Sequence, residues 1–185
     1  MICRRLEIEA AKNWDIFYKN NTTNFYKDRH YLLREFPELE QALKSAPEGK
    51  RVTLLDLGCG VGNAFWPMLQ LYPSQAKVQC CDFSKKAVQF ISDNPNFDSD
   101  IIDNQVCDLV NQEIPFPPQT AHFSWLIFVL SAIAPENFPK VALKIYNHLC
   151  NDSYFYFRDY GRYDLAQMRF AEKGTSKIAT NFYVR

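Results

Sequence analysis

The sequence predicts an α/β fold in which helices cover both faces of a parallel sheet, and three observations support this. Short apolar runs alternate with segments of helical periodicity, a pattern typical of parallel strands joined by helices. The first apolar run ends in an acid and leads into "GCGVG", which holds three of the 6 glycines and suits a turn from strand to helix. The 185 residues are 47% apolar, which is enough for the core of one domain.

The elements follow in order from about residue 52. Apolar runs predict five strands: Val52 to Leu57, Lys77 to Cys81, Asp103 to Cys107, His122 to Leu130 and Ser153 to Arg158. The segments between them predict three helices: Asn63 to Leu71, Lys85 to Ser92 and Glu136 to Leu149. We expect Ser84 to cap the second helix, and Pro67 to kink the first or to shorten its start.

Residues 1–50 differ from the rest in composition. They are aromatic and of mixed charge, helical in parts, and join the following chain through "SAPEGK". We therefore divide the chain into an N-terminal extension, 1–50, and a main domain, 51–185.

Charge and cysteine content exclude several classes of protein. Lys plus Arg and Asp plus Glu both total 21, so the whole-chain charge indicates neither a nucleic acid nor an anionic membrane. The most apolar run, "FSWLIFVLSAIA", is shorter than the ~20 residues of a membrane span. The 6 cysteines show no zinc-ligand spacing, and the N-terminus has no signal-peptide core. We expect no metal, no membrane and a cytoplasmic location, with the nucleus as the alternative.

Two aspartates follow the second and third predicted strands. Asp82 in "VQCCDFS" stands where a carboxylate can accept both hydroxyls of an adenosine ribose. Asp108 in "QVCDL" stands where an acid can accept from an adenine amino group while Leu109 packs near the ring. Each aspartate alone could be a helix cap or a turn residue. Together with the glycine turn, they predict a nucleotide-type cofactor.

The glycine spacing separates two cofactors. A dinucleotide fingerprint reads G-x-G-x-x-G, whereas this chain reads G-C-G-V-G with Asn63 at the third glycine position. The pattern acid-x-G-x-G-x-G, led by Asp56, resembles the first motif of Rossmann-like S-adenosylmethionine-dependent methyltransferases. That likeness implies that Asp56 orients the turn or the methionyl part of the cofactor.

Longer stretches carry a more specific resemblance. "KNWDIFYKNNTTNFYKDRHYLLREF", "LDLGCGVGN", "CDFSKKAV", "LIFVLSAIAP", "FRDYGRYDLAQMRF" and "NFYVR" together resemble the eukaryotic tRNA N3-methylcytidine methyltransferases, from about residue 11 to the last residue. The resemblance implies an S-adenosylmethionine-dependent enzyme of tRNA processing that forms 3-methylcytidine in the anticodon loop. It also implies, for some members, seryl-tRNA synthetase as a partner.

The resemblance assigns residues to the cofactor site. The implied contacts are Trp14, Tyr18, Gly58, Asp82, Asp108, Leu109 and Ile127. Trp14 and Tyr18 are four residues apart, so on a helix they share a face that could close over the cofactor. The alternative is an aromatic stripe that buries itself in the core.

The methyl acceptor and the RNA lead to further candidates. N3 of neutral cytosine already carries an in-plane lone pair, so no general base is needed, but the product ring is cationic. Asp159, after the fifth strand, is therefore the catalytic candidate, with a structural pair between Arg158 and Asp159 as the alternative. The residues expected to bind RNA are Lys27, Arg29, His30, Arg158 and Arg162. A solvated helix face is the alternative for the basic residues of the N-terminal extension.

The chain departs from the family after "NFYVR", where members continue with two further strands. We therefore expect the last two strands of the sheet to be missing and the methyltransferase domain to be incomplete at its C-terminus. Two other functions stay open. One is a catalytically silent truncated product that binds the cofactor or a protein partner. The other is an NAD-dependent oxidoreductase, which Asn63 and the lack of a visible tyrosine–lysine pair disfavour.

Overall fold

The computed structural model describes residues 8–23, 25–172, 177–179 and 182–183. The helices are α2 (Ala10–Asn21), α3 (Leu32–Glu35), α4 (Pro37–Ser45), α5 (Trp66–Leu71), α6 (Lys85–Ser92), α7 (Phe138–His148) and α8 (Leu165–Glu172), with 3₁₀ turns η1 (Leu130–Ala132) and η2 (Pro135–Asn137). The strands are β1 (Val52–Leu57), β2 (Ala76–Asp82), β3 (Ile102–Val106), β4 (Ala121–Ile127), β5 (Leu149–Arg158), β6 (Lys177–Ala179) and β7 (Phe182–Tyr183).

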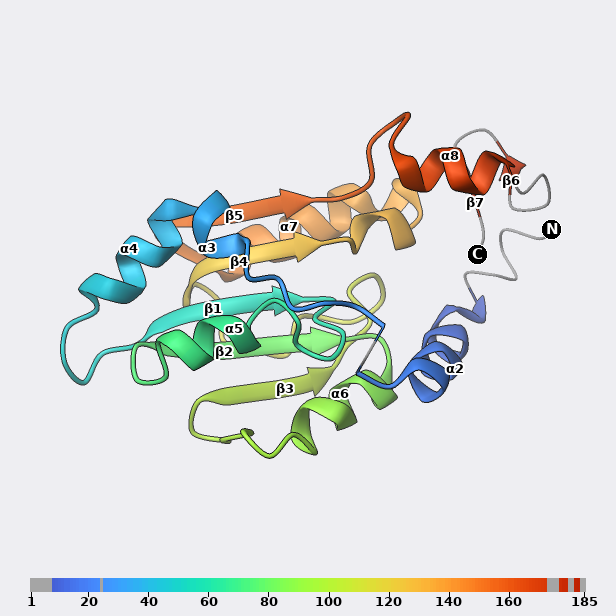
Figure 1. Cartoon of the computed structure of the whole chain (residues 1–185). Coiled ribbons are helices and arrows are strands. Elements are labelled where there is room, and N and C mark those ends of the chain that lie inside the picture. The colour runs from blue at the N-terminus through green and yellow to red at the C-terminus, as the bar shows by residue number, and fades with distance from the viewer. Residues whose placement is uncertain (1–7, 24, 173–176, 180–181, 184–185) are drawn as a thin grey trace.

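Five of these strands form one parallel sheet in the order β3-β2-β1-β4-β5. Their arrows in Figure 1 all point to the side of the molecule where α2 lies. Strands β6 and β7 pair with each other, antiparallel, in a separate sheet. The predicted α/β class with a parallel sheet is therefore confirmed, and the carboxyl ends of its strands share one edge.

Side chains on the two faces of the sheet form two core layers. Because successive residues of a strand point to opposite faces, Leu54 of β1 joins one layer and Leu55 the other. Residues of α3, α4 and α5 complete the first layer, and Val141 and Ile145 of α7 complete the second. Helices thus cover both faces, as the alternation of the sequence predicts.

The N-terminal segment contributes to the same core as the sheet. Leu32 of α3 and Leu39 and Leu43 of α4 are at most 1% exposed and lie in the layer that contains Leu54. Leu39 and Leu43 are four residues apart, which places both on one face of α4. Helices α3 and α4 are therefore packed parts of the sheet domain. The separate role given to residues 1–50, as cofactor lid and RNA contact, stays a prediction.

Several predicted element boundaries differ from the observed ones, including the start of β5 at Leu149 rather than Ser153. Backbone geometry explains two of the differences. Strand β4 ends at Ile127 rather than Leu130, because Phe128 has a φ of 60° and cannot continue an extended strand. Helix α5 begins at Trp66 rather than Asn63, because Gly62 has a φ of 90° and Pro67 occupies the first turn. The shortened start expected of Pro67 is confirmed. The predicted cap is confirmed too, since the Ser84 side chain accepts a hydrogen bond from the Ala87 N–H.

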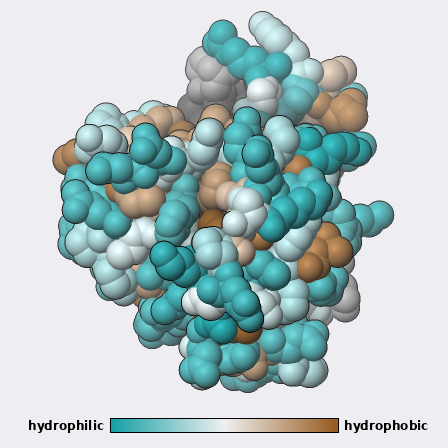
Figure 2. All heavy atoms as spheres, turned by 90° about the vertical axis from the view of Figure 1, so that its left-hand side faces the viewer, coloured by the Kyte–Doolittle hydropathy of each residue, from teal (hydrophilic) through white to brown (hydrophobic). Residues whose placement is uncertain are grey.

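Other features of the described residues concern membranes and metals. None of the described helices is long and apolar enough to cross a membrane. The same part of the chain contains no group of three or more His, Cys, Asp or Glu side chains placed to hold a metal ion. The face opposite α2 is mainly hydrophilic, with small separate apolar patches (Figure 2).

Candidate functional site

The parallel sheet brings five predicted site residues to one edge. Because the strand order is β3-β2-β1-β4-β5, the residues at or just after the strand ends follow in that order along it: Asp108, Asp82, Gly58, Ile127 and Asp159. The strand order reverses between β1 and β4, and ligands of open α/β sheets bind outside the carboxyl ends at such a point. The loop after β1 lies at this point.

The glycine turn after β1 is shaped by two requirements that only glycine meets. Gly58 and Gly60 have φ of 70° and 55°, a region that side chains rarely adopt. A Cβ atom on Gly58 would lie 2.5 Å from Cγ2 of Val129, and one on Gly60 would lie 2.6 Å from the hydroxyl oxygen of Tyr18. The turn is therefore pressed between the loop after β4 and helix α2.

Asp82 connects the end of β2 to this turn. Its Oδ2 accepts from the Gly60 N–H at 2.8 Å, and its Oδ1 accepts from the Ser84 N–H at 2.9 Å. Burial raises the pKa of Asp82, and the two backbone N–H donors act against that rise. A carboxylate oxygen has two lone pairs, so each oxygen keeps acceptor capacity for a ligand. This geometry suits a ligand that presents two hydroxyls.

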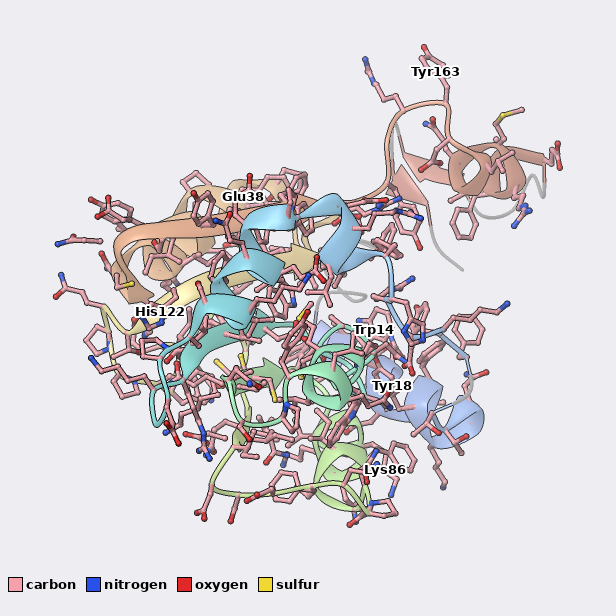
Figure 3. All side chains as sticks on the ribbon, turned by 60° about the vertical axis from the view of Figure 1, so that its left-hand side comes forward. Trp14, Tyr18, Glu38, Lys86, His122 and Tyr163 are labelled. Carbon is pink, nitrogen blue, oxygen red and sulfur yellow. The ribbon has the colours of Figure 1, made fainter. Side chains whose placement is uncertain are left out.

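Helix α2 lies over the turn. Tyr18 is 6% exposed and packs with Val61 and Ala87, and the ring centroid of Trp14 lies 6.0 Å from that of Tyr18. Both side chains come from the face of α2 that is turned toward the domain (Figure 3). The interpretation of Trp14 and Tyr18 as a cover for the cofactor and their interpretation as core residues are thus compatible, because the rings are partly or fully buried and also lie beside the glycine turn.

Asp15 holds α2 in this position. Its Oδ1 accepts from the Ser84 hydroxyl and, at 3.1 Å, from the Lys86 N–H. The carboxylate therefore satisfies a backbone donor in the first turn of α6, where a negative charge is favourable. This contact joins the helix that carries Trp14 and Tyr18 to the residues that follow Asp82.

A family model described as a methyltransferase domain matches residues 54–152, which is more than half of the chain. The chain belongs to this family. The match begins in β1 and includes the glycine turn, Asp82, Asp108 and all of β4.

Curated relatives match this methyltransferase chain over almost its whole length, among them a human and a Saccharomyces cerevisiae protein. This chain is 43% identical over 184 residues to the human protein named tRNA N(3)-cytidine methyltransferase METTL6, and the alignment covers 98% of this chain and 63% of the relative. It is 36% identical over 180 residues to the Saccharomyces cerevisiae protein named tRNA(Thr) (cytosine(32)-N(3))-methyltransferase, covering 95% of this chain and 28% of the relative. The chain thus spans less than two thirds of the length of each.

A solved structure supports the fold alone. A phosphoethanolamine N-methyltransferase of Haemonchus contortus, in complex with phosphomonomethylethanolamine and S-adenosylhomocysteine, superposes with a TM-score of 0.54 at 16% identity. The superposition covers 75% of this chain and 32% of the other. At that identity the likeness extends to the arrangement of strands and helices of the methyltransferase domain.

In this methyltransferase domain, the loop after β3 is organised by Asp108. Its Oδ1 accepts from the N–H groups of Val110 and Asn111 at 2.9 and 3.1 Å, and its Oδ2 accepts from the Asn111 side chain at 2.8 Å. Asp108 is therefore a turn residue, and Oδ2 still has a lone pair for a ligand. Leu109 is 8% exposed and packs in the layer under α7, so little of its surface remains for a ligand.

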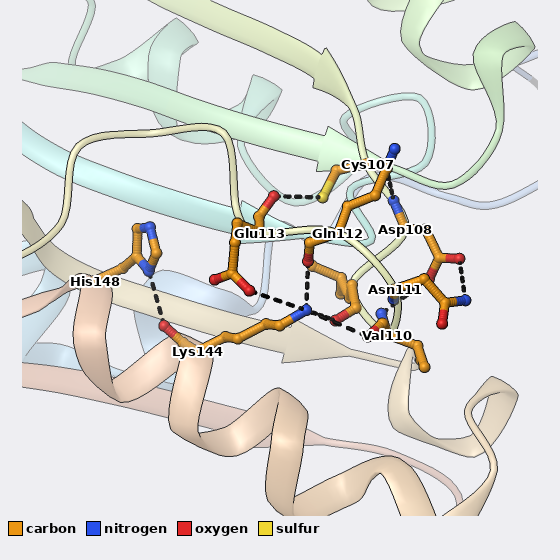
Figure 4. A network of polar contacts seen from close by, with 9 residues as sticks. Cys107, Asp108, Val110, Asn111, Gln112, Glu113, Lys144 and His148 are labelled. Atoms are coloured by element: carbon orange, nitrogen blue, oxygen red, sulfur yellow. Dashed lines mark hydrogen bonds and ion pairs between the residues drawn. The ribbon is translucent and has the colours of Figure 1, made fainter.

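Lys144 of α7 holds the same loop from below, and its role was not predicted. Its ammonium donates to the carbonyl oxygens of Leu109 and Val110, at 3.0 and 3.3 Å, and to that of Gln112 (Figure 4). Lys144 is only 6% exposed, and its other neighbour is the Glu113 carboxylate at 3.9 Å. A lysine on an amphipathic helix gives no signal in the sequence that its charge is buried against a loop.

Substituting Lys144 by methionine is expected to lower the free energy of unfolding by about 1–3 kcal/mol, because buried carbonyl groups lose their donor. Urea unfolding measures the change. The exposed Lys140→Met on the same helix is the control and should stay within about 0.5 kcal/mol of the wild type. Equal stabilities of the two variants would show that the ammonium contributes nothing to the loop.

Asp56 is a buried acid at the same edge. It is 2% exposed, and its Oδ2 has no hydrogen-bond partner among the described residues. Burial raises the pKa of Asp56 from its usual 3.8 to about 8. The Trp125 side chain acts against that rise, and a cation placed beside Oδ2 would favour the ionised form of Asp56.

This shift predicts a pH dependence of stability. Between about pH 4 and pH 8 the folded state binds more protons at Asp56 than the unfolded state does, so its contribution to stability is present at low pH and lost as the pH rises. From pH 5 to pH 7 the unfolding free energy of the wild type should fall by about 1–3 kcal/mol more than that of Asp56→Asn. Urea unfolding at the two pH values tests this. Parallel curves for both proteins would contradict it.

The predicted RNA-binding residues come from two parts of the chain: Lys27, Arg29 and His30 precede α3, and Arg158 and Arg162 lie at the end of β5 and in the loop before α8. Lys27 and His30 are exposed, and Arg162 is exposed in the loop before α8. The Arg158 guanidinium pairs with the Glu35 carboxylate and lies 4.6 Å from the ring centroid of Tyr31. The pair uses Nη1 of this half-exposed side chain, so its other N–H groups can still donate to a phosphate.

Asp159 is bound within the edge rather than paired with Arg158. Its Oδ2 accepts from the Ser131 N–H at 2.9 Å, and its Oδ1 accepts from the Tyr160 N–H at 2.8 Å. The carboxylate therefore joins the end of β5 to the loop after β4. Its catalytic role stays a prediction.

Asn63 stands at the third glycine position of the dinucleotide motif, and it makes contacts that this position does not predict. Its side-chain amide donates to the Tyr26 carbonyl at 3.2 Å and to the Asp28 carboxylate at 3.0 Å. The main-chain carbonyl of Asn63 accepts from the Arg29 N–H at 2.7 Å. Asn63 thus fastens the N-terminal segment to the glycine turn. A polar residue at the third glycine position is the signal that could have suggested such a contact.

Proposed function

We propose that this chain is an S-adenosylmethionine-dependent tRNA methyltransferase that forms 3-methylcytidine at an unpaired cytosine of the anticodon loop. The observation that carries the proposal is the 43% identity to a tRNA N(3)-cytidine methyltransferase over 98% of this chain. That extent includes α2, whose aromatic residues cover the glycine turn.

The residues at the edge fit the proposed cofactor. Asp82 keeps acceptor capacity for the ribose hydroxyls, and Asp108 keeps a lone pair for the adenine amino group. The unpaired Oδ2 of Asp56 suits the ammonium of the methionyl part. The space that a Cβ atom would take at Gly58 and Gly60 is filled by Val129 and by the Tyr18 hydroxyl, so the glycines let these two side chains close around the turn beside the proposed cofactor site.

The reaction needs positioning more than proton transfer. When bound, S-adenosylmethionine supplies a methyl group on a positively charged sulfur. The acceptor would be the in-plane N3 lone pair of an unpaired cytosine, and the methylated base would carry the positive charge. The chain would align the two partners, exclude water with α2, and stabilise the cationic product through Asp159.

The proposed substrate is RNA with a base outside a helix, because N3 lies on the Watson–Crick edge and is inaccessible in a pair. Seryl-tRNA synthetase as a partner is part of the same proposal. It is tested by adding the synthetase to the assay below and comparing the initial rates of methyl transfer.

Methyl transfer to a defined RNA tests the function. The purified chain is incubated with S-adenosylmethionine and an anticodon stem-loop that has one unpaired cytosine in the loop, and the digested RNA is analysed by mass spectrometry. We expect 3-methylcytidine from this RNA, and none when the same cytosine is paired in a duplex control.

Two results would overturn the proposal in different ways. Binding of S-adenosylmethionine without any methylated RNA, with the synthetase present or absent, would favour the catalytically silent product. Binding of NAD in place of S-adenosylmethionine would favour the oxidoreductase.

A further inference from the structure

Three side chains from distant parts of the chain meet at the carboxyl edge, beside the glycine turn. The ring centroids of Phe128 and Tyr160 are 5.0 Å apart, and the Arg29 guanidinium lies 5.1 Å from the Phe128 ring centroid. Arg29 also lies 5.8 Å from the ring centroid of Tyr26. We name Arg29, Phe128 and Tyr160 the aromatic platform.

Phe128 is held in an unusual backbone conformation. Its φ of 60° is uncommon for a bulky residue, and such a conformation persists only where the surrounding structure enforces it. Here the Phe128 N–H donates to the Arg158 carbonyl at 2.8 Å, which fixes the turn at the end of β4. Backbone strain of this kind collects at functional sites. The turn sends the chain from the end of β4 into the loop that touches Gly58.

The aromatic platform adjoins the glycine turn on one side and Asp159 on the other. The next residue, Val129, packs so close to Gly58 that a Cβ there would meet it at 2.5 Å. On the other side, Asp159 precedes Tyr160 and accepts from Ser131 in the same loop. The platform therefore lies between the glycine turn, proposed to hold the methyl donor, and the carboxylate proposed for the product charge.

We infer that the aromatic platform stacks the cytosine that receives the methyl group, an inference that rests on the proposed function. Tyr160 is 54% exposed, so its ring offers an apolar face to a base outside the domain core. Stacking on a ring leaves the Watson–Crick edge of the base free, so N3 can point toward the methyl donor. Because the product base is cationic, an aromatic face also binds it better than it binds the neutral base.

A fluorescent base reports on stacking independently of methyl transfer. Pyrrolocytosine, whose emission falls when it stacks, replaces the loop cytosine in the anticodon stem-loop, and RNA affinity is measured by titration. Wild-type protein should quench the probe. Tyr160→Leu and Phe128→Gly should lose the quenching, and their kcat/KM with the cytosine RNA should fall about ten- to a hundredfold.

The variants distinguish the effect of losing an aromatic ring from the effect of disturbing the fold. Glycine tolerates the φ of Phe128, so Phe128→Gly removes the ring without adding backbone strain. Tyr160→Phe keeps the ring and should recover the quenching that Tyr160→Leu loses. Tyr146→Leu, on a 74% exposed residue of α7, is the control for loss of a surface tyrosine.

The possible outcomes test base stacking on the aromatic platform and the proposed methyl transfer separately. Unchanged quenching and kcat/KM in Tyr160→Leu and Phe128→Gly would overturn the platform while leaving the methyltransferase proposal intact. Loss of quenching in both, with a wild type that forms no 3-methylcytidine, would support the platform as a base-binding surface and overturn the proposed activity. Absence of quenching by the wild type would overturn the platform directly.

Discussion

Replacing Gly58 by alanine is expected to lower the free energy of unfolding by about 2–5 kcal/mol and to weaken S-adenosylmethionine binding. The left-handed φ of 70° costs an alanine about 1–2 kcal/mol. The new Cβ would also meet the branched side chain of Val129 at 2.5 and 2.7 Å, and overpacking of this kind costs about 1–3 kcal/mol. Urea unfolding and calorimetric titration measure the two effects.

Gly49 supplies the matched control for this substitution. Its φ is 75°, similar to that of Gly58, but a Cβ there would have no atom within 4 Å. Gly49→Ala should therefore lose only the backbone part, about 1–2 kcal/mol, and bind the cofactor like the wild type. If the two variants lost equal stability, the loop after β4 would be able to move away from the glycine turn at no cost.

Substitution of Asp82 by alanine should weaken S-adenosylmethionine binding about ten- to a hundredfold. Losing a charged hydrogen bond to the ribose costs about 1.5–3 kcal/mol. The variant also leaves the N–H groups of Gly60 and Ser84 without their acceptor, so the turn itself becomes less ordered. Calorimetric titration with S-adenosylmethionine, and separately with NAD, gives the measurement.

Two further variants separate the charge from the turn. Asp82→Asn keeps an acceptor oxygen for one of the two N–H groups but loses the charge, so its affinity should lie between those of the wild type and Asp82→Ala. The exposed Asp93→Ala, just after α6, should bind like the wild type. An Asp82→Ala protein with wild-type affinity would remove Asp82 from the cofactor site.

Local signals determined most of the fold. The apolar runs located all five strands of the parallel sheet, and their alternation with helices indicated the class. Ser84 as a cap and Pro67 as a helix start were readable because caps and proline act within one turn. The end of β4 was placed too late, because the apolar run continues while the left-handed turn at Phe128 depends on its neighbours.

For the candidate site, the sequence by itself determined which residues stand at the strand ends: Gly58 in the turn, and acids such as Asp82 and Asp108 after the next two strands. Parallel strands bring such positions to one edge whatever the side chains between them, so the prediction needed no packing detail. The tertiary structure alone decided the contacts between segments: Asp15 with Ser84, Asn63 with Tyr26, Lys144 with the loop after Asp108, Arg29 with Phe128, and Phe128 with Tyr160. These pairs are far apart in the chain, and their meeting depends on how the elements pack. Local periodicity does not encode that packing.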